Sequence, residues 1–182
     1  MDRVHKRLAR SLCLKILFAN NFSNNDFKEL INNFFKQKDP DLDEIKYNSS
    51  QIKYASRLFE ITIANQNKTD ELIKQKLVNW EIDRIATIDR IILRMSLSEM
   101  LFMDEIPPKV SITEAVEIAK EFSSQDSSGF INGVMDAVYN DNFKKVSEHN
   151  KQDMGKDIGG CMDVAASNYN PKATVDDGSC KY

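Results

Sequence analysis

The chain has 182 residues, 41% of them hydrophobic and 29% charged, a composition typical of one globular domain with an additional segment. Its net charge of -3 argues against a protein that coats nucleic acid through bulk charge, although a local basic patch is compatible with it. No apolar run reaches the roughly 18 residues of a membrane span, and the basic N-terminus lacks the apolar core of a signal peptide. We therefore expect a cytoplasmic protein.

The N-terminal segment predicts an amphipathic helix of about four turns that begins near Val4. Between residues 1 and 15 a single acid, Asp2, stands against five basic residues: Arg3, Lys6, Arg7, Arg10 and Lys15. Because Arg3, Arg7 and Arg10 are spaced by four and three residues, they are expected on one helix face with Lys6 beside them. Such a face can be a phosphate-binding surface or simply a solvated one, and the residues alone leave both open.

Three further helices are expected before residue 80. Apolar residues from Phe27 to Phe35 predict the second helix, and the polar side chains of residues 48–50 are candidate caps for the third. Thr69 and Asp70 are expected to open a fourth helix that Trp80 closes. None of these segments carries a reactive constellation, so we interpret them as scaffold.

A nearly continuous apolar helix is predicted between Asp83 and Phe102. Its polar positions form one narrow stripe: Asp83, Thr87, Arg90, Arg94 and Ser98. A helix that is apolar around most of its circumference must be central. Pro107 and Pro108 then require the chain to turn.

Two shorter amphipathic helices are expected after the prolines. Ser111 and Glu114 have the spacing of a capping box, and Glu114 is expected to face solvent with the other acids of that helix. Start signals at residues 126–128 predict the last helix. Gly129 and Gly133 lie one turn apart within it, which suggests close approach by another helix or by a ligand, with plain helix packing favoured.

The chain changes character after Asn140. Residues 143–160 have the composition of a flexible linker, and Cys161 and Cys180 bracket a final segment that is rich in Asn and Asp. This segment resembles short repeats of secreted bacterial surface proteins. Three interpretations stay open: a reduced inert tail, a disulfide loop, or a cation site. The candidate oxygen ligands are Asp163, Asn168, Asn170, Asp176 and Asp177.

The sequence lacks the combinations of side chains that enzymes use. It has two histidines, His5 and His149, no glycine-rich phosphate loop after a strand, and no zinc spacing. Cys13 lies near the apolar face of the first helix and is interpreted as a small core residue. We therefore expect neither catalysis nor a cofactor or metal.

The segment IPPKVSITEAVEIAKEF followed by QDSSGFINGVMDAV, together with IDRIILRMSLSE, resembles the NusB family of bacterial transcription antitermination factors. The motifs cover residues 81–141, with a further match in residues 1–20. The resemblance implies an all-α fold, a compact bundle of about seven helices in two subdomains. It also implies a domain of residues 1–142, and the composition places the linker 143–160 and the tail 161–182 after it.

The resemblance further implies binding of boxA-type single-stranded RNA during rRNA transcription, together with NusE, a ribosomal small-subunit protein, in the antitermination complex. By this resemblance the RNA-binding residues are Arg3, Lys6, Arg7, Arg10, Phe18, Asp126, Ser127 and Phe130. Asp89 is then the acid that contacts NusE. The alternative is a helical protein-interaction adaptor without specific RNA binding, and the sequence leaves open a monomer or a homodimer.

Overall fold

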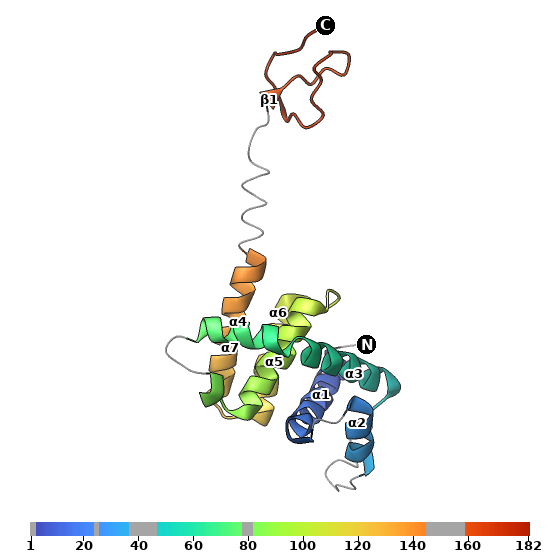
Figure 1. The fold of residues 1–182 in the computed structure, drawn as a ribbon, viewed down its shortest axis with the longest axis vertical. Helices are drawn as coiled ribbons and strands as arrows, with labels where there is room; N and C mark the ends of the chain where they lie inside the picture. Colours follow the sequence, from blue (N-terminus) through green and yellow to red (C-terminus); the bar gives the residue numbers. More distant parts are fainter. Residues whose placement is uncertain (1–2, 24–25, 37–46, 78–81, 145–158) are drawn as a thin grey trace. The chain divides into compact units, whose positions relative to one another are not determined.

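A computed structural model describes residues 3–23, 26–36, 47–77, 82–144 and 159–182 (Figure 1). Side chains of residues 3–5, 35, 36 and 144 are outside this description. Trp80, the loop at residues 38–46 and most of the expected linker are likewise outside the described residues. The chain divides into two compact units, Met1–Tyr139 and Asn140–Tyr182.

The first unit is all-helical, as predicted. Within the described residues it contains seven α-helices and one short 3-10 helix: α1 (Arg3–Ser23), α2 (Phe27–Lys36), α3 (Ser49–Ala64), α4 (Gln66–Lys76), η1 (Ile82–Arg84), α5 (Thr87–Phe102), α6 (Pro108–Phe122) and α7 (Ser127–Tyr139). No helix among the described residues is both long enough and apolar enough to cross a membrane.

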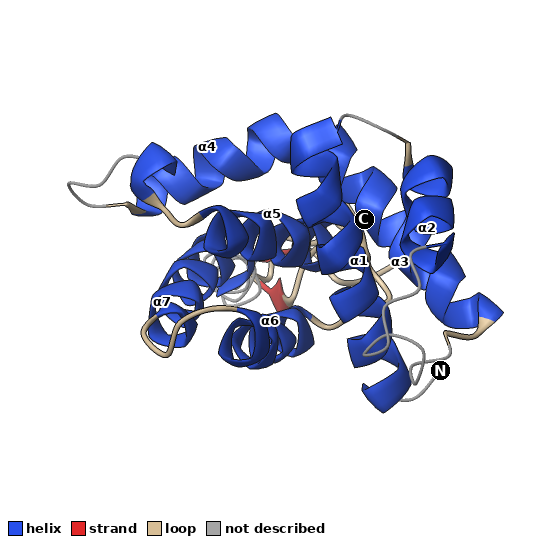
Figure 2. Ribbon diagram, turned by 90° about the horizontal axis from the view of Figure 1, so that it is seen from below, coloured by secondary structure: helices blue, strands red, loops and turns tan. Residues whose placement is uncertain are grey.

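Helix α5 is the centre of this unit, as its apolar sequence predicts. It packs against α1, α3, α4, α6 and α7, and Figure 2 shows it between α1 and α7. Residues 95–100 are all buried, including Ser98 and Glu99. The expected polar stripe is only partly exposed, since Ser98 at its end is buried. Arg94, also in the stripe, donates two hydrogen bonds to Asp70 of α4 (2.6 and 2.7 Å).

Local capping signals predict some helix starts and misplace others. Asn48 caps α3 through a capping box, in which its side chain accepts from the Gln51 amide while Gln51 accepts from the Asn48 amide. The expected start of α4 at Thr69 is wrong, because α4 begins at Gln66 and Thr69 is buried inside it. Thr69 Oγ1 instead donates to the Gln66 carbonyl at 2.9 Å.

The predicted capping box at Ser111 and Glu114 is also wrong. Helix α6 already begins at Pro108, whose missing N–H costs nothing in a first turn. Ser111 and Glu114 therefore lie inside the helix, and both are buried. Their polar atoms have partners on other helices.

The second unit contains the π-helix η2 (Asn140–Lys144) and a small closed segment near the C-terminus. In that segment β1 (Gly159–Gly160) pairs in parallel with β2 (Val175–Asp176). Cys161 and Cys180 are disulfide-bonded, so the structure has the disulfide loop and not the reduced tail. No group of three or more His, Cys, Asp or Glu suited to hold a metal occurs in the described part of the chain.

Candidate nucleic-acid interface

Two arginines of α1, Arg7 and Arg10, contact buried acids of other helices. Arg10 is only 2% exposed, and its Nε donates to Glu99 Oε1 of α5 at 2.7 Å. Arg7 donates from Nε and Nη2 to the two carboxylate oxygens of Glu114 in α6, at 2.8 and 2.9 Å. Paired arginine–carboxylate contacts of this kind fix orientation as well as contributing energy. The two arginines therefore tie α1 to α5 and α6.

Glu99 is the centre of a buried polar cluster. Besides Arg10, it accepts hydrogen bonds from Tyr54 Oη of α3 (2.5 Å) and Ser111 Oγ of α6 (2.7 Å). The Arg10 guanidinium also lies over the Tyr54 ring, 5.7 Å from its centroid. Burial, reinforced by the Glu99 carboxylate, raises the pKa of the Tyr54 hydroxyl, so Tyr54 stays a proton donor to Glu99. Side chains from four helices thus meet at one carboxylate, and both of its oxygens accept hydrogen bonds.

This cluster corrects the expectation that Arg10 belongs to an exposed basic face. A guanidinium that is buried and bonded to Glu99 is not part of an exposed cationic face. Arg7 keeps 34% of its side chain exposed, and its pKa is raised mainly by the hydrogen bond with Glu114. Lys6 and Lys15 are partly exposed, whereas Arg3 begins α1 with a side chain outside the described set.

Sequence reasoning missed these ion pairs because the partners are 89 and 107 residues apart. One signal was present. Glu99 is an acid that lies outside the expected polar stripe of a largely apolar helix, and a buried acid requires a paired donor.

The second half of α1 presents aromatic side chains. Phe18 is 40% exposed and Phe22 is 72% exposed, and their rings meet edge to face with centroids 5.2 Å apart. Lys15, one turn earlier, places its Nζ 5.6 Å from the ring centroid of Phe122, the last residue of α6. This contact brings the middle of α1 to the connection between α6 and α7.

Asp89 and Ser127 are held in a buried network at that connection. Asp89 Oδ1 accepts from Ser123 Oγ (2.5 Å) and Asp89 Oδ2 accepts from Ser127 Oγ (2.8 Å). Asp89 is 6% exposed, so the acid in the first turn of α5 is buried. Its two hydrogen bonds join the first turn of α5 to the C-cap residue of α6, Ser123, and to the start of α7.

A cavity of about 610 Å³ opens beside this network. It is bordered by the end of α4, by η1, by the first turn of α5 and by α7, and its lining includes Asp89, Asp126, Ser127 and Phe130. Gly129 and Gly133 also line it, and a Cβ built on either would meet nothing within 4 Å. The glycines therefore face open space, and the prediction that they pack closely against a helix is wrong.

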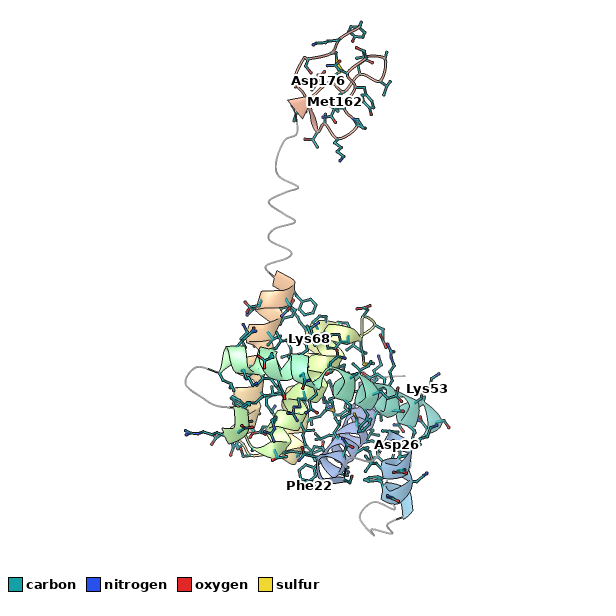
Figure 3. All side chains as sticks on the ribbon, viewed as in Figure 1. Phe22, Asp26, Lys53, Lys68, Met162 and Asp176 are labelled. Carbon is teal, nitrogen blue, oxygen red and sulfur yellow. A yellow bond between two sulfur atoms is a disulfide. The ribbon has the colours of Figure 1, made fainter. Side chains whose placement is uncertain are left out.

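The predicted site residues thus fall into two groups. Lys6, Arg7, Arg10 and Phe18 lie on α1, whereas Asp89, Asp126, Ser127 and Phe130 gather at the cavity. The groups are linked by contacts that run from Lys15 to Phe122, and then from Ser123 to Asp89 and Ser127. Figure 3 shows the side chains of this unit.

Cys13 is the free cysteine among the described residues. Burial raises the pKa of the Cys13 thiol well above its ordinary value, and Cys13 is completely buried in α1. A buried neutral thiol of this kind behaves as a small apolar residue, as predicted for Cys13.

The first unit is thus an all-helical domain whose first helix carries basic side chains and exposed aromatic rings. Residues 7–140 match the NusB family, and the chain belongs to this family of transcription antitermination proteins, which bind RNA and are not enzymes. Over 133 residues the chain is 41% identical to the transcription antitermination protein NusB of Salinibacter ruber, covering 73% of this chain and 79% of that protein. It is 40% identical over 136 residues to NusB of Natranaerobius thermophilus, covering 74% and 94%.

Solved structures have the same fold. NusB of T. maritima superposes with a TM-score of 0.64 at 29% sequence identity, covering 82% of this chain and 98% of that chain. A structure of NusB and NusE in complex with double-stranded RNA also has a TM-score of 0.64, at 23% identity, and covers 76% of this chain and 98% of that chain. At that identity the second comparison supports the fold alone.

Proposed function

We propose that this protein binds boxA-type single-stranded RNA together with NusE during rRNA transcription. The observation that carries the proposal is the first helix of a NusB-family domain, which has basic residues in its first half, exposed aromatic rings in its second half, and no acidic residue. Cations bind phosphates and aromatic faces stack on unpaired bases, which are the two contacts that single-stranded RNA offers.

We propose different tasks for the RNA-binding residues. Arg3, Lys6 and Arg7 supply charge to phosphates, while Phe18, Asp126 and Phe130 meet bases beyond them. Arg10 and Ser127 are buried in hydrogen bonds, so they act by positioning α1 and the start of α7. Asp89 likewise shapes the cavity wall that we assign to NusE, without being exposed itself.

The reassignment of Arg10 changes the expected salt dependence. Three phosphate contacts give a slope of log affinity against log salt of about -2, and an affinity loss of about twentyfold between 50 and 200 mM salt. So few contacts make RNA binding weak without a partner. NusE would raise the affinity through linked binding if it added RNA-binding surface, and we expect an increase of at least tenfold.

The test is a titration of labelled boxA-like RNA at the two salt concentrations, with and without NusE. Lys6→Gln is expected to weaken binding and to reduce the salt slope by about 0.7, because one phosphate contact is lost. Lys53→Gln removes the same charge from an exposed position on α3 and is the matched control. Charge reversal at Arg7 or Arg10 would be ambiguous, because both hold the fold.

The outcomes separate the parts of the proposal. Equal affinity for a scrambled RNA would refute sequence-specific recognition. Absence of RNA binding at 50 mM salt, combined with retained NusE binding, would instead support the protein-interaction adaptor.

A further inference from the structure

Phe22 is the most exposed large hydrophobic side chain among the described residues of the helical unit, at 72% exposure. Phe22, which is labelled in Figure 3, lies near the end of α1, four residues after Phe18 and seven after Lys15. Residues with this spacing share one face of a helix. Lys15, Phe18 and Phe22 therefore form a stripe along α1, which we call the aromatic stripe.

Folding of the helical unit does not account for this stripe. Burying a phenylalanine contributes stability only when its surface leaves water, and most of the Phe22 ring remains in water. Its described ring contact is the edge-to-face contact with Phe18, at an interplanar angle of 63°. In that arrangement the two rings are set at different angles and leave aromatic surface exposed.

The charges around the stripe indicate the kind of partner it suits. Helix α1 contains no Asp or Glu, and Lys15 stands at the near end of the stripe with its ammonium over the ring of Phe122. A helix with exposed aromatic rings, neighbouring cations and no acid is suited to bind a negatively charged polymer whose flat apolar groups can stack on the rings. Single-stranded RNA has both features, and stacking on aromatic side chains tolerates any base.

We propose that Phe22, together with Phe18, forms a platform on which bases of single-stranded RNA stack, and that this platform extends the RNA path to the end of α1. This inference rests on the proposed function and adds a contact residue to it. Phe22 makes no phosphate contact in this arrangement, so its contribution does not depend on salt.

The experiment uses the full chain and a single-stranded RNA in which 2-aminopurine replaces individual bases. Phe22→Ala is expected to lower RNA affinity about 5- to 150-fold, which corresponds to the loss of one stacked base, with the salt slope unchanged. Phe22→Trp should keep the affinity, because it keeps an aromatic face. Phe22→Leu should lose it, although it keeps an apolar side chain. Quenching of one 2-aminopurine position by wild type and not by Phe22→Ala would show the stack directly.

Several outcomes would overturn the inference. If wild type binds RNA and Phe22→Leu binds equally well, the platform is not a stacking site, while the proposed function stands. If Phe22→Ala weakens NusE binding measured without RNA, the stripe is a protein contact. If wild type binds no RNA, with or without NusE, both proposals fail. Circular dichroism and the urea midpoint should be unchanged in all three variants, because Phe22 is exposed.

Discussion

The two units of this chain are stabilised in opposite ways. The helical unit buries a large apolar core and encloses charged groups such as Arg10 and Glu99. In the segment at residues 159–182, by contrast, only Gly160, Cys161 and Ala166 are buried. A segment of this size cannot bury enough surface to fold by the hydrophobic effect, so it needs a covalent link.

Local hydrogen bonds complete the closed segment. Four side chains each accept from the backbone amide two residues further on, which is the pattern of an Asx turn: Asp163, Asn170, Asp176 and Asp177. Asn168 connects distant parts, since it donates to the Ser179 carbonyl (2.7 Å) and accepts from the Lys181 amide (2.8 Å). Many of the side-chain oxygens proposed as cation ligands thus accept hydrogen bonds from the chain's own backbone amides.

The largest effect is expected from breaking the buried ion pair of the helical unit. Arg10→Met leaves the Glu99 carboxylate buried without its cation, which should lower the free energy of unfolding by about 3–5 kcal/mol in urea denaturation. Arg57→Met is the control, because Arg57 pairs with Glu105 on the exposed surface, and it should cost no more than about 1 kcal/mol. Equal costs for the two variants would contradict the role assigned to the Glu99 cluster.

Reduction of the disulfide should unfold the segment at residues 159–182 and leave the helical unit folded. The Cys161–Cys180 disulfide joins residues that are 19 positions apart. It stabilises such a segment by about 3 kcal/mol, because it lowers the conformational entropy of the unfolded chain. We expect a reductant to remove the dispersion of the amide NMR shifts of residues 159–182, while the shifts of α1–α7 stay unchanged. The double variant Cys161→Ser, Cys180→Ser should match the reduced spectrum without reductant. Dispersed tail signals after reduction would show that the Asx turns suffice.

The smallest effect concerns one exposed carboxylate. Tyr182 Oη donates to Asp163 Oδ2 at 2.7 Å, and this bond, with the Ala165 amide, holds the pKa of Asp163 below its ordinary value. Because the folded-state pKa is the lower one, the contribution is present above the unfolded pKa and is lost as pH falls through the folded pKa. Tyr182→Phe should raise the Asp163 pKa towards its ordinary value in a carboxyl NMR titration. The pKa of Asp177, which is lowered by its hydrogen bonds with Ser179, serves as an internal reference that should not move.

The helices of the first unit could largely be read from local sequence. The apolar run of α5, the cap at Asn48 and the start of α7 after Asp126 each depend on side chains within a few residues of one another. The candidate site could be read only in part. Phe18 was correctly placed on α1, but nothing local distinguished the exposed Lys6 from the buried Arg10.

Sequence alone therefore determined the all-helical class, the central position of α5 and the change of character after Asn140. Only tertiary structure decided that Arg7 and Arg10 neutralise Glu114 and Glu99, and that Gly129 and Gly133 border a cavity. The physical reason is the separation along the chain over which each effect acts. Periodicity and capping act between neighbours in the chain, whereas the partner of a charge is whichever group packing brings within a few ångströms of it.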